Sequence, residues 1–374
     1  FAEAGVVLLM FTIGLEFSLT RLLAAKKLVL GVGGAQVTSI TLLGSLVFLG
    51  LGVQPVLAVI LGGGIAMSST AITLKQLGEQ GELGMVHGKV ATGILLFQDV
   101  AAIPFLVLLP LLGNGGPGQE EALWLTLARA AAVFLILVML GRHLLPRLLH
   151  WVAGTHSLEL FMLVVLTLAL GAAALTLLAG LSATLGAFMA GMLLGETRFR
   201  YQIEADIRPF RDLMLGVFFI SIGMRLDPAI LMDEPGAILL VLAALIMVKA
   251  LLMTLLVRGF GYDWFESARS AVVLAQGGEF GLLLVAQVIA IGGVQSEFLQ
   301  PVLAGLIISM LIAPVLIRLN HPLAQLLTGR PPGRLETDRL DNLAETTEGM
   351  QEHVILCGYG HLGQGIARIL REQD

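Results

Sequence analysis

The chain has 374 residues, of which 57% are hydrophobic and 13% charged, and its mean hydropathy is +0.91. Soluble domains carry about 25% charged residues and alternate apolar with polar faces, so this composition excludes an ordinary soluble domain and predicts an all-α protein that crosses a membrane several times. The net charge of −5 is too small to indicate a nucleic-acid partner, and the single cysteine, Cys357, excludes an internal disulfide framework.

Eleven apolar segments are predicted to span the membrane, the seventh and eighth of them short. They are Phe1–Phe17, Leu28–Leu51, Val56–Leu77, Val90–Leu112, Ala122–Leu140, Leu158–Leu178, Leu181–Leu194, Leu213–Met224, Ala237–Val257, Ala271–Ile291 and Phe298–Ile317. Lysine and arginine gather in alternate loops, beginning with Ser18–Lys27, whereas loops such as Asp227–Pro235 are acidic or neutral. The positive-inside rule therefore places Ser18–Lys27 in the cytoplasm and Phe1 outside. We expect the natural chain to extend beyond both ends, because each lies within a segment or motif.

After Arg318 the composition changes from apolar to mixed. We predict a transmembrane domain over 1–319, a linker over 320–350 and, over 351–374, the start of a nucleotide-binding domain. A short apolar strand, His353–Cys357, precedes Gly358, Gly360 and Gly363. Glycines at this spacing allow a tight turn and close approach of a pyrophosphate. The acidic ribose ligand is expected about 20 residues further on, beyond Asp374, so we expect no nucleotide binding by this fragment alone.

Asp99 lies near the centre of the fourth segment, next to Gln98. An aspartate at that depth costs about 2.5–3.5 kcal/mol to insert, so it faces protein or water and usually has a function. A carboxylate can hold either a proton or a cation, which is the chemistry of antiport. The alternative is an aspartate that only hydrogen-bonds neighbouring helices.

Two further charges, Lys249 and Glu279, lie inside predicted spans. Lys249 is a counter-charge near the carboxylate or a structural ammonium between helices. Glu279 is a second proton site or, as we favour, an acid that neutralises exposed helix N-termini.

Small and hydroxyl residues interrupt the third and tenth segments. The third contains Gly62-Gly63-Gly64 followed by Ser68-Ser69-Thr70, and the tenth contains Gln276-Gly277-Gly278-Glu279. Such clusters mark helices that break within the membrane, and a pair of broken helices is typical of a transporter's binding site. Close packing through small residues is the alternative. We expect His87, in a cytoplasmic loop, to be solvated, and we find no sequence pattern typical of an enzyme.

At these residues the chain resembles the Kef-type potassium/proton antiporters of the monovalent cation:proton antiporter-2 family. The similar stretches are Gly5–Glu16, Ser68–Ile72, Leu95–Pro104, Phe218–Met224 and Gln276–Phe280, and His353–Gly363 resembles the opening of the family's regulatory domain. The resemblance implies a homodimer in the bacterial inner membrane, with a sodium/proton-antiporter-like fold of inverted repeats and two crossed discontinuous helices.

The resemblance also implies roles for single residues. Asp99 and Gln98 match the potassium ligands, with Ser69, Thr70, Lys249 and Glu279 around them. The loop Tyr201–Arg211 resembles a regulatory loop, and the full-length protein is expected to take a nucleotide (AMP or NAD(H)) or glutathione as regulator, although transport itself needs no cofactor. The Gln–Asp pair resembles the potassium branch, with electroneutral exchange. Sodium/proton exchange is the near alternative. A ligand-gated potassium channel is less favoured, because the sequence contains no Thr-Val-Gly-Tyr-Gly-like filter. An oxidoreductase that uses the terminal glycines is also less favoured.

Overall fold

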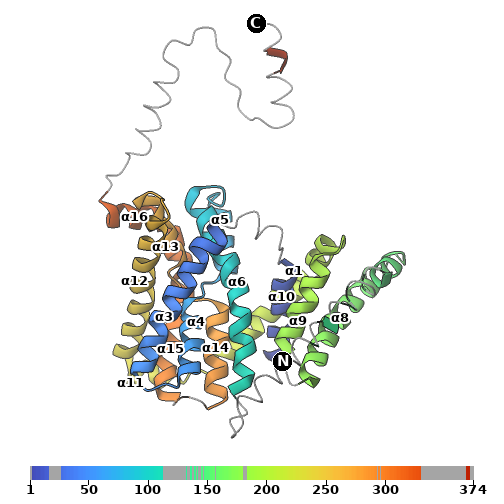
Figure 1. Cartoon of the computed structure of the whole chain (residues 1–374), viewed down its shortest axis with the longest axis horizontal. Helices are drawn as coiled ribbons and strands as arrows, with labels where there is room; N and C mark the ends of the chain where they lie inside the picture. The colour runs from blue at the N-terminus through green and yellow to red at the C-terminus, as the bar shows by residue number, and fades with distance from the viewer. Residues whose placement is uncertain are drawn as a thin grey trace. The chain divides into compact units, whose positions relative to one another are not determined.

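The structure is a computed structural model that describes residues 2–16, 27–112, 147–155, 157–179, 183–292, 294, 296–329 and 368–370, with six further single positions between 132 and 145. The chain divides into two compact units, Phe1–Thr328 and Gly329–Asp374. Figure 1 shows that the described part of the first unit is built from helices and their short connections.

Residues 147–153 of the first unit are helical, and its other described residues include one short π-helical element and fourteen α-helices. In chain order these are α1 (Ala2–Glu16), η1 (Lys27–Gly33), α3 (Gly34–Gly50), α4 (Pro55–Ala66), α5 (Thr70–Glu79), α6 (Val86–Leu112), α8 (Leu158–Leu178), α9 (Ala183–Gly195), α10 (Arg200–Gly223), α11 (Ile230–Asp233), α12 (Pro235–Gly259), α13 (Trp264–Leu274), α14 (Glu279–Ala290), α15 (Ser296–Arg318) and α16 (Asn320–Thr328).

The described helices confirm a multi-pass membrane protein. Six stretches are long and apolar enough to cross a bilayer, and the bent pair α13 and α14 makes a seventh. The sequence predicted eleven because it also counted α1 and α9, which have 15 and 13 residues, and the second half of α10, whose first half is charged. The fifth predicted span, Ala122–Leu140, lies mostly outside the described residues.

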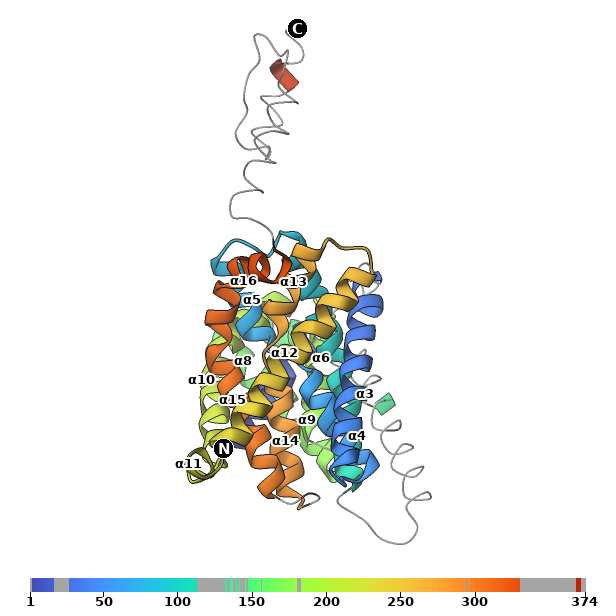
Figure 2. The same cartoon turned by 90° about the vertical axis from the view of Figure 1, so that its left-hand side faces the viewer.

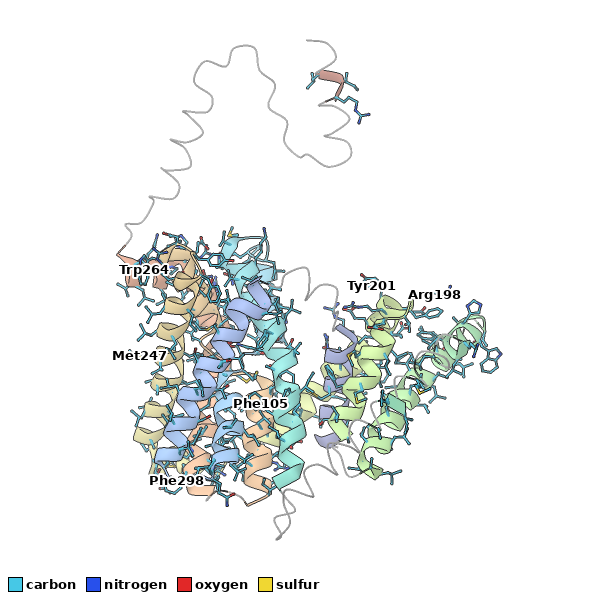
Figure 3. The ribbon with its side chains drawn as sticks, in the orientation of Figure 1. Phe105, Arg198, Tyr201, Met247, Trp264 and Phe298 are labelled. Atoms are coloured by element: carbon cyan, nitrogen blue, oxygen red, sulfur yellow. The ribbon has the colours of Figure 1, made fainter. Side chains whose placement is uncertain are left out.

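Helix α12 shows how the unit meets lipid. It buries Leu245, Lys249 and Met253 but leaves Leu240 and Met247 71% and 69% exposed, and Figure 3 shows Met247 on the outer side of the bundle. A row of exposed large apolar side chains is unfavourable in water and favourable against hydrocarbon. The outward face of α12 therefore faces lipid.

The helices of the first unit form two groups. Helices α1, α8, α9 and α10 pack on one another, and η1 with α3–α6 and α12–α16 form the other group. Figure 2 shows α3, α4, α12 and α15 together in the second group. Within the first group, Gly14 of α1 and Gly191 of α9 let the two backbones touch, because a Cβ at either position would collide with the other helix.

Two broken helices cross inside the second group, which confirms the predicted pair of discontinuous helices. The first consists of α4 and α5, separated by Met67–Ser69, and the second of α13 and α14, which differ in direction by 43°. The two breaks touch: a Cβ added to Gly278 would lie 2.6 Å from the backbone carbon of Ser68. Glycine is needed here because another backbone occupies the space of a side chain.

The prediction that Tyr201–Arg211 forms a loop is wrong, because these residues belong to α10. The run of charges suggested a solvated connection. However, Ile203 and Ile207, four residues apart, are 0% and 1% exposed, so the segment is an amphipathic helix with one apolar stripe. Pro209 lies inside it without ending it.

The end of the first unit also differs from the predicted boundary at residue 319. Helix α16 continues to Thr328 and packs on α13, with Asn320 and Ala324 buried. The segment therefore begins as a packed helix where a linker was predicted. In the second unit only Gly329 and residues 368–370 are described, and 368–370 are helical. The strand His353–Cys357 and the glycines Gly358, Gly360 and Gly363 lie outside the described residues.

We predict that Gly278→Ala lowers thermal stability, because the added methyl group displaces the Ser68 backbone at the crossing. The expected loss of unfolding free energy is about 1–3 kcal/mol. The readout is the melting temperature of the purified protein in detergent. Gly171→Ala in α8 is the control, since a Cβ there meets nothing within 4 Å. Equal melting temperatures for the two variants would contradict a tight crossing.

Candidate functional site

Asp99 lies in the middle of α6, beside the start of the half-helix α5. The Thr70 hydroxyl donates a hydrogen bond of 3.0 Å to Asp99 Oδ1. Thr70 is the first residue of α5, and the preceding Ser69 caps this helix by accepting a hydrogen bond from the backbone N–H of Ile72 at 3.3 Å. The N-terminal end of a helix carries partial positive charge, which favours an anionic carboxylate nearby.

A large cavity reaches Asp99 from the charged end of the first unit. It has a volume of about 760 Å³ and lies between α5 and α6 on one side and α9 and α10 on the other. Its mouth carries charged and polar side chains of α10: Arg200, Tyr201, Glu204, Arg208 and Arg211. Figure 3 places Tyr201 at the same end of the helices as Trp264 and opposite Phe298.

A second, small cavity of about 10 Å³ touches Asp99 as well. Its walls are mostly apolar and include Met10 of α1, Phe188 of α9 and Phe280 of α14. Asp99 thus belongs to one helix group and faces the other. Its carboxylate lies between a wide cavity with a polar mouth and a narrow apolar pocket.

Lys249 of α12 binds both breaks at once. Its side-chain Nζ donates to the carbonyl oxygen of Met67 at 2.8 Å and to that of Gln276 at 2.9 Å. These carbonyls lie at the C-terminal ends of α4 and α13, where helices carry partial negative charge and free acceptors. The ammonium, which is 2% exposed, therefore satisfies two half-helix ends. Of the two roles predicted for Lys249, the geometry supports the structural ammonium.

Amide side chains satisfy other backbone groups of the first break. Gln98 accepts a hydrogen bond from the N–H of Ser68 at 2.7 Å through Oε1 and donates to Gln36 Oε1 at 2.8 Å through Nε2. Gln36 of α3 in turn donates to the carbonyl of Ala66 at 3.0 Å. Both polar atoms of Gln98 are therefore engaged within the protein.

The second break is satisfied in the same way. The Ser68 hydroxyl donates to the carbonyl of Leu274 at 2.8 Å, so the first break also stabilises the second. The N–H of Gly277 donates to Ser309 Oγ at 3.0 Å. Gln276 Nε2 donates to Thr73 Oγ1 at 2.8 Å. Each donor or acceptor would otherwise lie unpaired in a membrane interior, which costs several kcal/mol.

Glu279 is the first residue of α14 and is 4% exposed. Its carboxyl lies within hydrogen-bonding reach of the Ser69 side chain, and its Oε2 has no partner among the described residues. The acid therefore stands close to the N-terminal ends of both α14 and α5. This position fits the electrostatic role that we favoured from the sequence.

The structure thus brings all six predicted site residues to one crossing: Ser69, Thr70, Gln98, Asp99, Lys249 and Glu279. Sequence reasoning missed Gln36 and Ser309. Gln36 had a usable signal, since it is an amide within an otherwise apolar span and is 1% exposed. Ser309 had none, because a single serine in an apolar helix is common.

His87 was predicted to be solvated, and this is wrong: its side chain is 0% exposed. It lies 2.9 Å from Glu82 and 3.2 Å from Glu266, through opposite ring nitrogens. Arg269 donates to Glu82 at 2.7 Å and to Asn320 Oδ1 at 2.6 Å. The position of His87 at the start of α6 suggested a loop, whereas Glu266 of α13, far away in the chain, binds its ring.

The comparisons with known proteins agree with this geometry. Residues 1–319 match the family described as "Sodium/hydrogen exchanger, transmembrane". The chain belongs to this sodium/hydrogen exchanger family. It is a family of transporters, and the multi-pass architecture of the described residues is the one expected of it.

Three curated relatives confirm the resemblance to Kef-type antiporters. The putative K(+) efflux antiporter KefB of Alkalimonas amylolytica is 42% identical, over 100% of this chain and 57% of its own length. The chloroplastic K(+) efflux antiporter 1 of Arabidopsis thaliana is 38% identical, over 100% of this chain and 31% of its own. The glutathione-regulated potassium-efflux system protein KefC of Klebsiella pneumoniae is 34% identical, over 99% and 58%. The chain therefore spans between about a third and three fifths of the length of these three relatives.

A solved structure shows the same fold. The sodium proton antiporter MjNhaP1 from Methanocaldococcus jannaschii, solved at pH 8, superposes with a TM-score of 0.62 over 86% of this chain and 84% of that one, at 17% sequence identity. The exchanger-family fold is thus shared although most side chains differ.

We predict that Lys249→Met destabilises the protein, because the Met67 and Gln276 carbonyls lose their donor. An unsatisfied buried group costs about 1–3 kcal/mol. The readout is the melting temperature in detergent, with Lys75→Met, exposed on α5, as the matched control. A melting temperature as high as that of the control variant would show that the ammonium does not support the breaks.

We also predict a pH-dependent contribution from Glu82, which lies between α5 and α6 outside the spans. Burial by itself raises the pKa of this carboxyl, but the His87 hydrogen bond and the Arg269 charge hold the pKa below its ordinary value of 4.5. The stabilisation is therefore present above pH 4.5 and is lost as the pH falls through the lower folded pKa. Wild type should melt above Glu82→Gln at neutral pH, and this difference should shrink in acid. Glu79→Gln, exposed at the end of α5, should show no such convergence.

Proposed function

We propose that this chain is the transport part of an antiporter that exchanges potassium for protons, with Asp99 holding a proton or a cation in turn. The observation that carries the proposal is the position of Asp99: an acid in mid-helix, on the wall of a cavity of about 760 Å³, at the boundary between two helix groups. A carboxylate there is neutralised either by a proton or by a monovalent cation, so each excludes the other.

The ligand shell that we propose centres on Asp99. The Thr70 hydroxyl lies 3.0 Å from the carboxylate and can turn its oxygen lone pairs to a cation. The predicted direct contribution of Gln98 is not supported by this geometry, because its carbonyl oxygen is bound to the Ser68 N–H. With one carboxylate exchanging one positive charge for another, the cycle is electroneutral.

The transport movement that we propose is an elevator-like displacement of one helix group against the other. The interior of the group that contains Asp99 is tied together by the hydrogen bonds at the two breaks. The other group supplies the facing wall, with Phe188 of α9 in contact with both cavities. Motion along this boundary would expose the carboxylate to each side in turn.

Potassium is favoured over sodium because the curated relatives are named as potassium efflux antiporters. Sodium/proton exchange is the second candidate, supported by the shared fold with a sodium proton antiporter. For the full-length protein we also propose a homodimer in a bacterial inner membrane. Regulation by a nucleotide or glutathione is proposed as well, by analogy with the glutathione-regulated relative.

We predict that Asp99→Asn abolishes exchange, because the variant loses the only ionisable ligand proposed. The exchange rate is expected to fall at least about a hundredfold below that of wild type. The measurement is potassium and sodium flux into proteoliposomes under an imposed pH gradient, at matched protein levels and with melting temperatures recorded. Asp233→Asn, exposed on α11, is the control. Preserved proton-coupled exchange in Asp99→Asn would refute the assignment, and faster sodium than potassium flux in wild type would refute the preferred cation.

A further inference from the structure

Gln36, on α3, is buried beside the site and is not one of the residues assigned to it by sequence. Its side chain is 1% exposed and makes hydrogen bonds at both ends of its amide. Nε2 donates to the carbonyl of Ala66, the last residue of α4, and Oε1 accepts from Gln98 Nε2. Helix α3 thus contacts the broken helix and α6 through one side chain.

The orientation of both amides is fixed by chemistry. The Ser68 N–H can only donate, so it must face the oxygen of Gln98. The Ala66 carbonyl can only accept, so it must face the nitrogen of Gln36. This leaves the Gln36 oxygen for the Gln98 nitrogen, as observed at 2.8 Å. Rotating either amide by half a turn would place like atoms against each other at two contacts.

The chain of amides joins α6 to the first break at a point next to the ion site. Gln98 binds the backbone of Ser68, and the following residue, Asp99, binds the side chain of Thr70. Two successive residues of α6 therefore hold two nearby residues of the break. Fixing Gln98 on the α3 side sets the rotation of α6 that points Asp99 toward α5 and α9.

The geometry assigns to Gln36 the role of a positioning residue that sets cation preference by keeping the Gln98 carbonyl out of the ligand shell of Asp99. The inference rests on the proposed function, because it concerns the ion bound at Asp99. Without the Gln36 acceptor, the Gln98 amide is held only by the Ser68 N–H, and its oxygen can turn a second lone pair toward the cation. An added neutral oxygen ligand changes the size and coordination number of the site, and hence its preference between potassium and sodium.

The test is Gln36→Leu, which removes both hydrogen bonds with little change in volume. Apparent affinities for K⁺ and Na⁺ are measured by flux in proteoliposomes and, independently of transport, by cation-dependent thermal stabilisation in detergent. We expect the K⁺/Na⁺ affinity ratio to change about tenfold, the factor that corresponds to about 1.4 kcal/mol. Ser45→Ala is the control, since Ser45 is buried on the same helix and bonds only within it, to the Thr41 carbonyl.

A double variant separates positioning from general damage. If Gln36 acts through Gln98, then Gln36→Leu combined with Gln98→Leu has the same affinity ratio as Gln98→Leu alone. A wild-type ratio in Gln36→Leu, whatever its rate or melting temperature, overturns the inference, as does an additive effect in the double variant.

Gln36→Glu covers the case in which Gln36→Leu does not fold. A glutamate keeps an acceptor for Gln98 Nε2, and when protonated it also donates to Ala66, so the wild-type ratio is expected in acid. A ratio that differs from wild type in acid would overturn the inference. Failure of the proposed function gives a different result: wild type then shows no proton-coupled flux, while the binding ratio from thermal stabilisation still tests Gln36.

Discussion

The whole arrangement depends on how two interrupted helices are tolerated inside a membrane. A break exposes backbone N–H and C=O groups that hydrocarbon cannot satisfy, and each unpaired group costs several kcal/mol. Here the two breaks lie against each other, with Gly278 on the Ser68 backbone. One ammonium, that of Lys249, serves a carbonyl from each break. The crossing is therefore a single polar unit whose parts cannot be satisfied separately.

The position of the carboxylate follows from this unit. The same residues that satisfy the first break bind α6: Ser68 holds Gln98 and Thr70 holds Asp99. The acid is thereby fixed to the group of helices that contains both breaks, while its open side faces α9 and α10 across the cavity. A group whose interior is bonded in this way can move as one body.

The sequence indicated which polar residues gather at the crossing because intramembrane polar residues are few and costly. Asp99, Lys249 and Glu279 could each be found by depth alone, and the small-residue clusters indicated both breaks. The same reasoning failed at His87, whose partner Glu266 lies on α13, a helix far away in the chain that packs on α6. It failed at the start of α10 for a related reason, since the burial of Ile203 needs a packing partner that no local pattern names.

By itself, then, the sequence determined that the chain is a helical membrane protein, which segments break and which acids lie within the spans. These properties depend on the cost of placing single groups in hydrocarbon, which is a property of each residue. Only the tertiary structure decided what each polar side chain does there. Lys249 bonds two carbonyls, Gln98 is engaged by Ser68 and Gln36, and Asp99 faces the large cavity beside Thr70. Hydrogen-bond partners come from four or more helices, so their assignment required the helices to be packed together.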